Sequence, residues 1–104
     1  MSRELVTEKV SYLEVSSGEL EQFIIHELGV REDFSIAALE ELSNDTYHVV
    51  RPARLVRNEG EYNEVVYWKA DPNGIPAPSL RVILGYLVVN KLISDMDYLI
   101  RISW

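Results

Sequence analysis

Cysteine is absent from this chain of 104 residues. Its absence excludes disulfide bonds, thiolate catalysis and cysteine-ligated zinc, and it fits a reducing compartment. The chain does not open on a basic segment followed by an apolar run, so we expect no signal peptide and a cytoplasmic location. The longest nearly apolar run, Val82 to Val89, is far shorter than the roughly 20 residues that a bilayer span needs. We therefore expect no membrane partner.

Motifs for chemistry are absent as well. Neither H-x-x-x-H nor H-E-x-x-H occurs around the two histidines, His26 and His48, so we expect no metal site. The sequence has no G-x-S-x-G nucleophile motif and no glycine-rich phosphate loop. We expect no cofactor and favour a noncatalytic protein. A small enzyme, with His48 and Tyr47 as candidate residues, is the last alternative.

Negative charge dominates the chain, whose net charge is −7. Residues 1–45 hold three cationic side chains against eleven carboxylates, whereas residues 46–104 hold seven against six. Because carboxylates repel phosphates, we expect no nucleic-acid partner, and the acidic half is a solvated surface or a docking face for a protein. Hydrophobic residues make up 47% of the chain, enough for the core of one domain over residues 1–104.

The N-terminal part of the chain has the clearest helix signals. Val10 to Val15 predicts a first strand. The sequence that follows fits a capping box, in which the side chains of Ser16 and Glu19 each accept a hydrogen bond from the other's backbone. Gly29 stands where a left-handed C-cap is favoured, so we predict a helix over 17–28.

The middle of the chain is interpreted as a short helix followed by a β-hairpin. Apolar residues at a spacing of four predict the helix at about 34–43. Thr46 to Val50 predicts a strand, which Pro52 confines to a sheet edge because proline cannot donate a ladder hydrogen bond. A turn at 58–60 then leads into Tyr62 to Lys69, whose valine, tyrosine and tryptophan residues are typical of a second strand.

The C-terminal part contains a loop, a long apolar segment and a final strand. Three prolines predict an irregular loop over 71–78. Residues 80–93 fit a helix with Ser79 as N-cap, apolar on two faces, although Val82 to Val89 is also compatible with a buried strand. Tyr98 to Trp104 alternates with a period of two, which predicts a strand built into a sheet.

Together these elements predict an α+β fold. Their order is strand, helix, hairpin, helix and strand, which is the βαββαβ order of ferredoxin-like folds. In such folds two helices cover one face of a four-stranded antiparallel sheet. The short helix at about 34–43 is an addition to that pattern.

One group of residues is the candidate binding site. Arginines recur at every third position in the first arm of the predicted hairpin, and other ring-bearing side chains lie nearby in sequence. The group consists of Arg51, Arg54, Arg57, His48, Tyr67 and Trp68. Closely spaced guanidinium groups beside aromatic rings can bind a phosphate, a carboxylate or an acidic partner.

The spacing of the arginines leaves two interpretations open. In a strand, residues three apart point to opposite faces, so Arg51, Arg54 and Arg57 form one patch only if Pro52 bends the chain. The alternative is an edge strand that charge and proline protect from aggregation.

Our leading interpretation is a small noncatalytic module that binds another protein, as a regulatory, inhibitory or assembly subunit. The alternative is a small-anion or nucleotide-binding domain that uses the three arginines with Tyr67 or Trp68 as a stacking surface. We also predict a homodimer, because a helix over 80–93 that is apolar on two faces needs cover from a second subunit, unless the unpaired sheet edge forms the interface.

Overall fold

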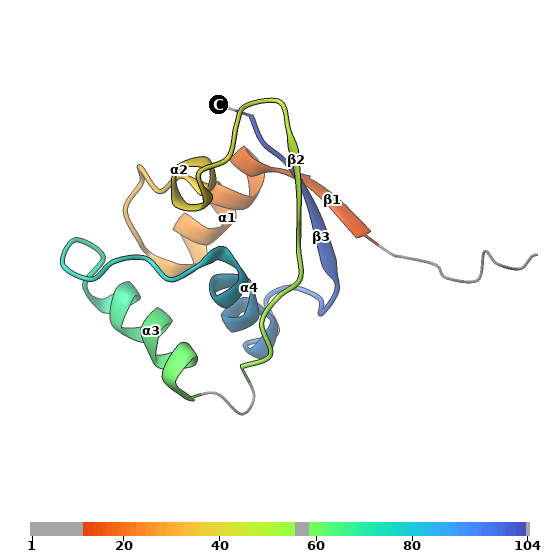
Figure 1. Cartoon of the computed structure of the whole chain (residues 1–104). Helices are drawn as coiled ribbons and strands as arrows, with labels where there is room; N and C mark the ends of the chain where they lie inside the picture. The colour runs from red at the N-terminus through yellow and green to blue at the C-terminus, as the bar shows by residue number, and fades with distance from the viewer. Residues whose placement is uncertain (1–11, 56–58, 104) are drawn as a thin grey trace, which may run out of the picture.

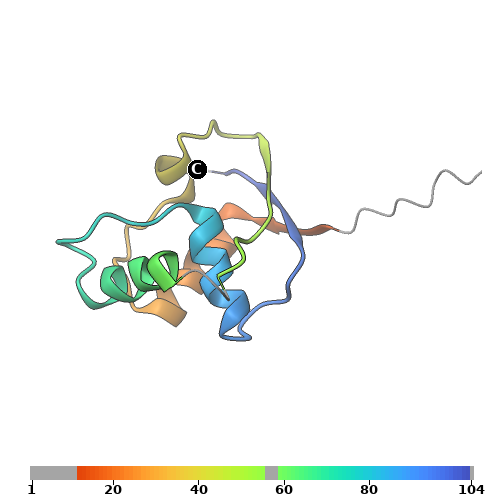
Figure 2. The same cartoon turned by 60° about the horizontal axis from the view of Figure 1, so that its bottom comes forward.

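The computed structural model describes residues 12–55 and 59–103, which form a compact α+β fold with a three-stranded sheet and four helices (Figure 1). The elements, in chain order, are β1 (Tyr12–Ser16), α1 (Ser17–Leu28), α2 (Ile36–Glu40), β2 (Tyr47–Val50), α3 (Glu59–Ala70), α4 (Leu80–Val89) and β3 (Asp97–Arg101). All four helices lie on one side of the sheet, and α3 lies farthest from it (Figure 2).

The last strand of the chain is the central strand of the sheet. The strand order is β1-β3-β2, with β1 parallel and β2 antiparallel to β3. Ile100 therefore has Val15 on one side and His48 on the other. This arrangement confirms a strand in the alternating C-terminal segment, although β3 ends at Arg101, and Ile102 and Ser103 lie beyond it. The final residue of the segment, Trp104, lies outside the described residues.

The helix predicted over 17–28 is confirmed with the same bounds. The Ser16 hydroxyl accepts a hydrogen bond from the backbone of Glu19 at 3.2 Å, and the Glu19 carboxylate accepts one from the backbone of Ser16 at 3.4 Å. Gly29 ends the helix with a φ of +66°, a conformation that glycine adopts without steric cost. Local signals thus determine both ends of α1.

Two glutamates connect the helices to one another. The Glu21 carboxylate in α1 accepts a hydrogen bond from the backbone of Ile36 at 2.8 Å, and Glu40 in α2 accepts one from the backbone of Leu80 at 3.1 Å. The N-cap predicted at Ser79 makes no side-chain capping bond; Glu40 satisfies the start of α4 instead. Part of the N-terminal negative charge therefore has a structural role.

The short predicted helix exists but is shorter than 34–43. It spans Ile36–Glu40, and the Ser35 hydroxyl caps it by accepting from the backbone of Ala38 at 3.2 Å. The chain leaves the helix at Glu41, which has a φ of +55°. A left-handed residue cannot continue a right-handed helix, so α2 ends there.

The predicted β-hairpin is wrong, because its second arm is helix α3. Residues 59–60, expected in a turn, already belong to this helix. Val65 and Trp68 are three residues apart and both buried, and the ring centroids of Tyr62 and Tyr86 lie 4.9 Å apart where α3 packs on α4. Packing against α4 outweighs the strand propensity of valine, tyrosine and tryptophan.

Helix α4 confirms the favoured interpretation of the long apolar segment, although it ends at Val89 instead of residue 93. Every residue from Val82 to Leu87 is buried. The helix lies between the sheet and α3, and the chain at residues 52–55 crosses it (Figure 2). Both of its apolar faces are therefore covered within one chain except at Val89, which is 36% exposed, so the argument for a dimer through this helix is largely lost.

The ferredoxin-like pattern is not confirmed, because the sheet is mixed and three-stranded. One of the four expected strands is missing, because residues 59–70 form helix α3, which belongs to the helical layer. The parallel pairing of β1 with β3 needs a long crossover, which the helices and β2 supply. The coarser prediction of an α+β fold is confirmed.

Candidate functional site

Two of the predicted site residues, Arg51 and Arg54, line one cavity of about 600 Å³. It lies where the end of β2, the start of α4, the start of α3 and the start of β3 meet. A third arginine from α4 joins them, and three carboxylates complete the charged lining. The lining residues are Arg51, Pro52, Ala53, Arg54, Glu61, Arg81, Asp95, Met96 and Asp97.

Pro52 and the segment after it explain how the two arginines reach the same cavity. The ladder of β2 ends at Val50, and Pro52 and Ala53 are buried. The backbone of Ala53 donates a hydrogen bond to the carbonyl of Arg81 at 3.0 Å, which ties this segment to the first turn of α4. The alternation of a strand no longer applies, so Arg51 and Arg54 are not forced onto opposite sides.

Gly85 makes this crossing possible. A Cβ atom at this position would overlap the carbonyl oxygen of Ala53 and press on the side chain of Leu55. Only glycine lets the backbone of this segment approach α4 so closely. The glycine in the middle of an otherwise apolar helix therefore helps to position Arg54 beside Arg81.

One guanidinium of the cavity is already paired. Arg51 donates two hydrogen bonds to the carboxylate of Asp97, from Nε to Oδ1 at 3.0 Å and from Nη2 to Oδ2 at 3.2 Å. These bonds, with the Coulomb attraction of the same pair, lower the pKa of Asp97 and raise the pKa of Arg51. Asp95 adds a further attraction that raises the pKa of Arg51.

Arg54 and Arg81 differ from Arg51 in this respect. Both side chains are exposed, and neither forms an ion pair or a side-chain hydrogen bond within the described residues 12–55 and 59–103. Sequence inspection missed Arg81, because it lies 27 positions after Arg54 and only the fold brings the two together. Guanidinium groups of this kind keep their donors available for an oxyanion.

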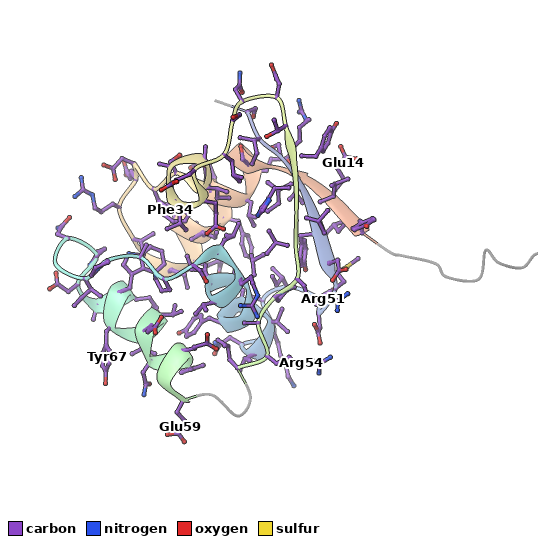
Figure 3. All side chains as sticks on the ribbon, in the orientation of Figure 1. Glu14, Phe34, Arg51, Arg54, Glu59 and Tyr67 are labelled. Carbon is purple, nitrogen blue, oxygen red and sulfur yellow. The ribbon has the colours of Figure 1, made fainter. Side chains whose placement is uncertain are left out.

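The predicted aromatic residues do not reach this cavity. Tyr67 is 60% exposed and points outward from α3, away from Arg51 and Arg54 (Figure 3). Trp68 is buried and packs on Phe34, with ring centroids 5.5 Å apart, where it lines a separate apolar cleft of about 370 Å³ under the loop at 71–78. No stacking surface for a nucleotide base is present among the described residues of the arginine cavity. Arg57 lies outside the described residues.

His48 lies in β2, half-buried on the side of the sheet that faces the helices. Its neighbour Tyr47 points to the opposite face, so the fold does not bring the two candidate catalytic residues together. Across residues 12–55 and 59–103, no group of three or more histidine, aspartate or glutamate side chains is placed to hold a metal ion. The same part of the chain contains no helix that is long and apolar enough to cross a bilayer.

The second candidate site is the sheet face that the helices leave uncovered, which we call the outer face. The register places eight side chains on it, three from β1, two from β2 and three from β3. They are Tyr12, Glu14, Ser16, Tyr47, Val49, Asp97, Leu99 and Arg101. Tyr47 and Val49 are 59% and 48% exposed, although both lie in the sheet.

The alternating sequence of β2 indicates that some of its apolar side chains lie on the outer face. Tyr47 and Val49 alternate with His48 and Val50, so only one of the two pairs can point to the core. The predicted four-stranded sheet also has one face without helices. The prediction nevertheless gives the wrong composition for that face, because it counts residues 62–69 of helix α3 as a strand. Comparison with known protein families, with curated proteins and with solved structures found no match for this chain.

Proposed function

We propose that this protein is a noncatalytic interaction module whose outer face binds another protein, with a second copy of the chain as the partner. The observation that carries this proposal is the exposure of Tyr12, Tyr47 and Val49 on one sheet face, which none of the helices in residues 12–55 and 59–103 covers. Contiguous apolar and aromatic groups on a protein surface usually mark an interface. A regulatory, inhibitory or assembly role would use such a surface.

The charges of the outer face support a second copy as its partner. Glu14 and Arg101 give this face charges of both signs, and its third charged residue, Asp97, is paired with Arg51, whereas the whole chain carries a net charge of −7. In a twofold dimer, a residue away from the axis meets a different residue of the copy, so a face with both signs can match itself. Glu14 of one protomer can then approach Arg101 of the other.

Light scattering at micromolar concentration tests this proposal. We expect twice the chain mass of 12.0 kDa for the unaltered protein and the single chain mass for Tyr47→Ser. Removing a large ring from an interface weakens association, because the apolar area that the ring would bury is lost.

Tyr67→Ser is the matched control. Tyr67 is as exposed as Tyr47, but it lies on α3, away from the outer face (Figure 3). We expect this variant to remain a dimer. A protein that stays at 12.0 kDa across the concentration range, or a Tyr67→Ser variant that dissociates as readily as Tyr47→Ser, would show that the outer face does not pair with itself.

A further inference from the structure

The arginine cavity contains two cationic side chains that the described fold does not use. Arg54 and Arg81 form no ion pair among residues 12–55 and 59–103, whereas Arg51 on the same lining is held by Asp97. A protein with an excess of carboxylates can easily neutralise an exposed guanidinium, as Arg31 shows by binding Asp33 at 2.8 Å. Two unpaired guanidiniums on one cavity are therefore available for a ligand.

The backbone beneath these side chains is well fixed. Pro52 has a restricted φ angle, and the backbone N–H of Ala53 donates a hydrogen bond to the carbonyl of Arg81. Gly85 allows residues 52–55 to lie directly on α4. Arg54 follows Ala53 in sequence, so this hydrogen bond holds the two arginine backbones side by side. A ligand that bridges them does not have to order the main chain first, which lowers the entropic cost of binding.

We propose that Arg54 and Arg81 form a binding site for an oxyanion group, a carboxylate or a phosphate, on a small molecule. The planar guanidinium presents paired N–H donors whose spacing matches two oxygens of such a group. The cavity of about 600 Å³ has room for a small metabolite. This inference is independent of the outer face and of the dimer proposed above.

The carboxylates on the same lining limit which anions fit. Asp95, Asp97 and Glu61 lie on the cavity together with the arginines. Asp97 is neutralised by Arg51, but the lining as a whole holds as many carboxylates as guanidiniums. A polyanion such as a nucleoside triphosphate would bring several negative charges close to these carboxylates and would be repelled. The site therefore selects a ligand with a single anionic group.

Nuclear magnetic resonance of the arginine Nε–H groups tests the proposal with inorganic phosphate, acetate and tripolyphosphate as probes. We expect saturable shifts at Arg54 and Arg81 with phosphate or acetate, and none at Arg101, which is an exposed and unpaired arginine on the outer face. The probe that saturates at the lower concentration identifies the head group. Tripolyphosphate is expected to bind no more tightly than phosphate.

Three variants complete the experiment. Arg54→Gln and Arg81→Gln should each weaken binding by about 10- to 100-fold, since each removes charge-assisted hydrogen bonds to the anion. Arg101→Gln is the matched control and should leave the affinity unchanged. If either cavity variant unfolds, the shifts in the unaltered protein still decide the question.

Several outcomes would overturn the proposal. One is the absence of saturable shifts at Arg54 and Arg81 with every probe. Another is an equal shift at Arg101, which would indicate unselective attraction of ions to exposed arginines. A third is tighter binding of tripolyphosphate than of phosphate, which would contradict a site limited to one anionic group.

A Tyr47→Ser variant that is monomeric yet binds phosphate normally would separate this site from the proposed interface.

Discussion

The two faces of the sheet are built from similar residues but differ in what covers them. On the inner face, Tyr98, Ile100 and Ile102 are buried under the helices. On the outer face, Tyr47 and Val49 belong to the same class of aromatic and β-branched residues and are about half exposed. The outer face therefore exposes apolar residues that are not part of the core of the single chain. This difference separates positions that stabilise the fold from positions available to a partner.

The sharpest test compares two neighbours on β3. Ile100 is fully buried on the inner face, so Ile100→Ala should lower the free energy of unfolding by about 2–5 kcal/mol through lost burial and a residual cavity. Leu99 is half-buried on the outer face, and Leu99→Ala should cost less than about 1 kcal/mol. Urea denaturation measures both values.

A reversal of this order would break the comparison. If Leu99→Ala destabilises a dilute monomer as much as Ile100→Ala does, the outer face contributes to the core of the single chain. If it does so only at concentrations where the protein is dimeric, the lost energy belongs to the interface.

The second test concerns the close packing behind the inner face. Gly85→Ala places a Cβ on the backbone of Ala53, so we expect a loss of about 1–3 kcal/mol despite the higher helix propensity of alanine. Gly18→Ala is the matched control in α1, where no atom lies within 4 Å of the added Cβ. Thermal unfolding should show the control unchanged or slightly stabilised.

The third test removes two hydrogen bonds that join the helical layer to the chain beyond β3. Ser17 is buried. Its hydroxyl donates a hydrogen bond to the backbone carbonyl of Ser103 at 3.1 Å and accepts one from the backbone N–H of Ser103 at 3.0 Å. Ser17→Ala leaves both backbone groups without this partner and should cost about 1–2 kcal/mol. Hydrogen exchange at the amide of Ser103 should accelerate, while that of Val49 on β2 should change little. Equal acceleration at both amides would mean that the variant unfolds globally.

Elements with strong local signals could be predicted from the sequence. The capping box at Ser16 and the glycine at 29 defined α1, and strict alternation defined β3. The strand pairing could not be predicted, because β1 and β3 are far apart in sequence and no local pattern indicates which strands lie side by side. Helix α3 was missed since its buried positions are few, Val65 and Trp68, and its β-forming residues suggested a strand.

The candidate sites were predictable to a smaller extent. Arg51 and Arg54 are predictable because they are close in sequence, and the end of the β2 ladder before Pro52 allows them to converge on one cavity. Arg81 comes from another element, and its role depends on the contact between Gly85 and Ala53, which no local pattern reveals. The aromatic residues Tyr67 and Trp68 were placed by the wrong hairpin, and in the helix they point away from the cavity.

The smallest expected effect concerns the ion pair between Arg51 and Asp97, which lies at the end of the outer face and lines the cavity. Hydrogen bonding from Arg51 lowers the pKa of Asp97 in the folded protein below the ordinary aspartate value. A group with a lowered folded pKa adds stability above the unfolded pKa and loses it as pH falls through the folded pKa. The Arg51 side chain is 80% exposed, although that of Asp97 is only 18% exposed, so water screens the pair and this contribution is small.

Titration of the Asp97 carboxyl by nuclear magnetic resonance measures the effect directly. Arg51→Gln should raise the titration midpoint of Asp97, and it should lower stability slightly at neutral pH but not in acid below the midpoint of the unaltered protein. The same variant leaves Arg54 and Arg81 in place, so phosphate should still bind in the cavity, but more weakly, because Asp97 on the lining is no longer neutralised. An Asp97 midpoint that does not move would show that the two hydrogen bonds do not form in solution, and the charge balance inferred for the cavity would then have to be revised.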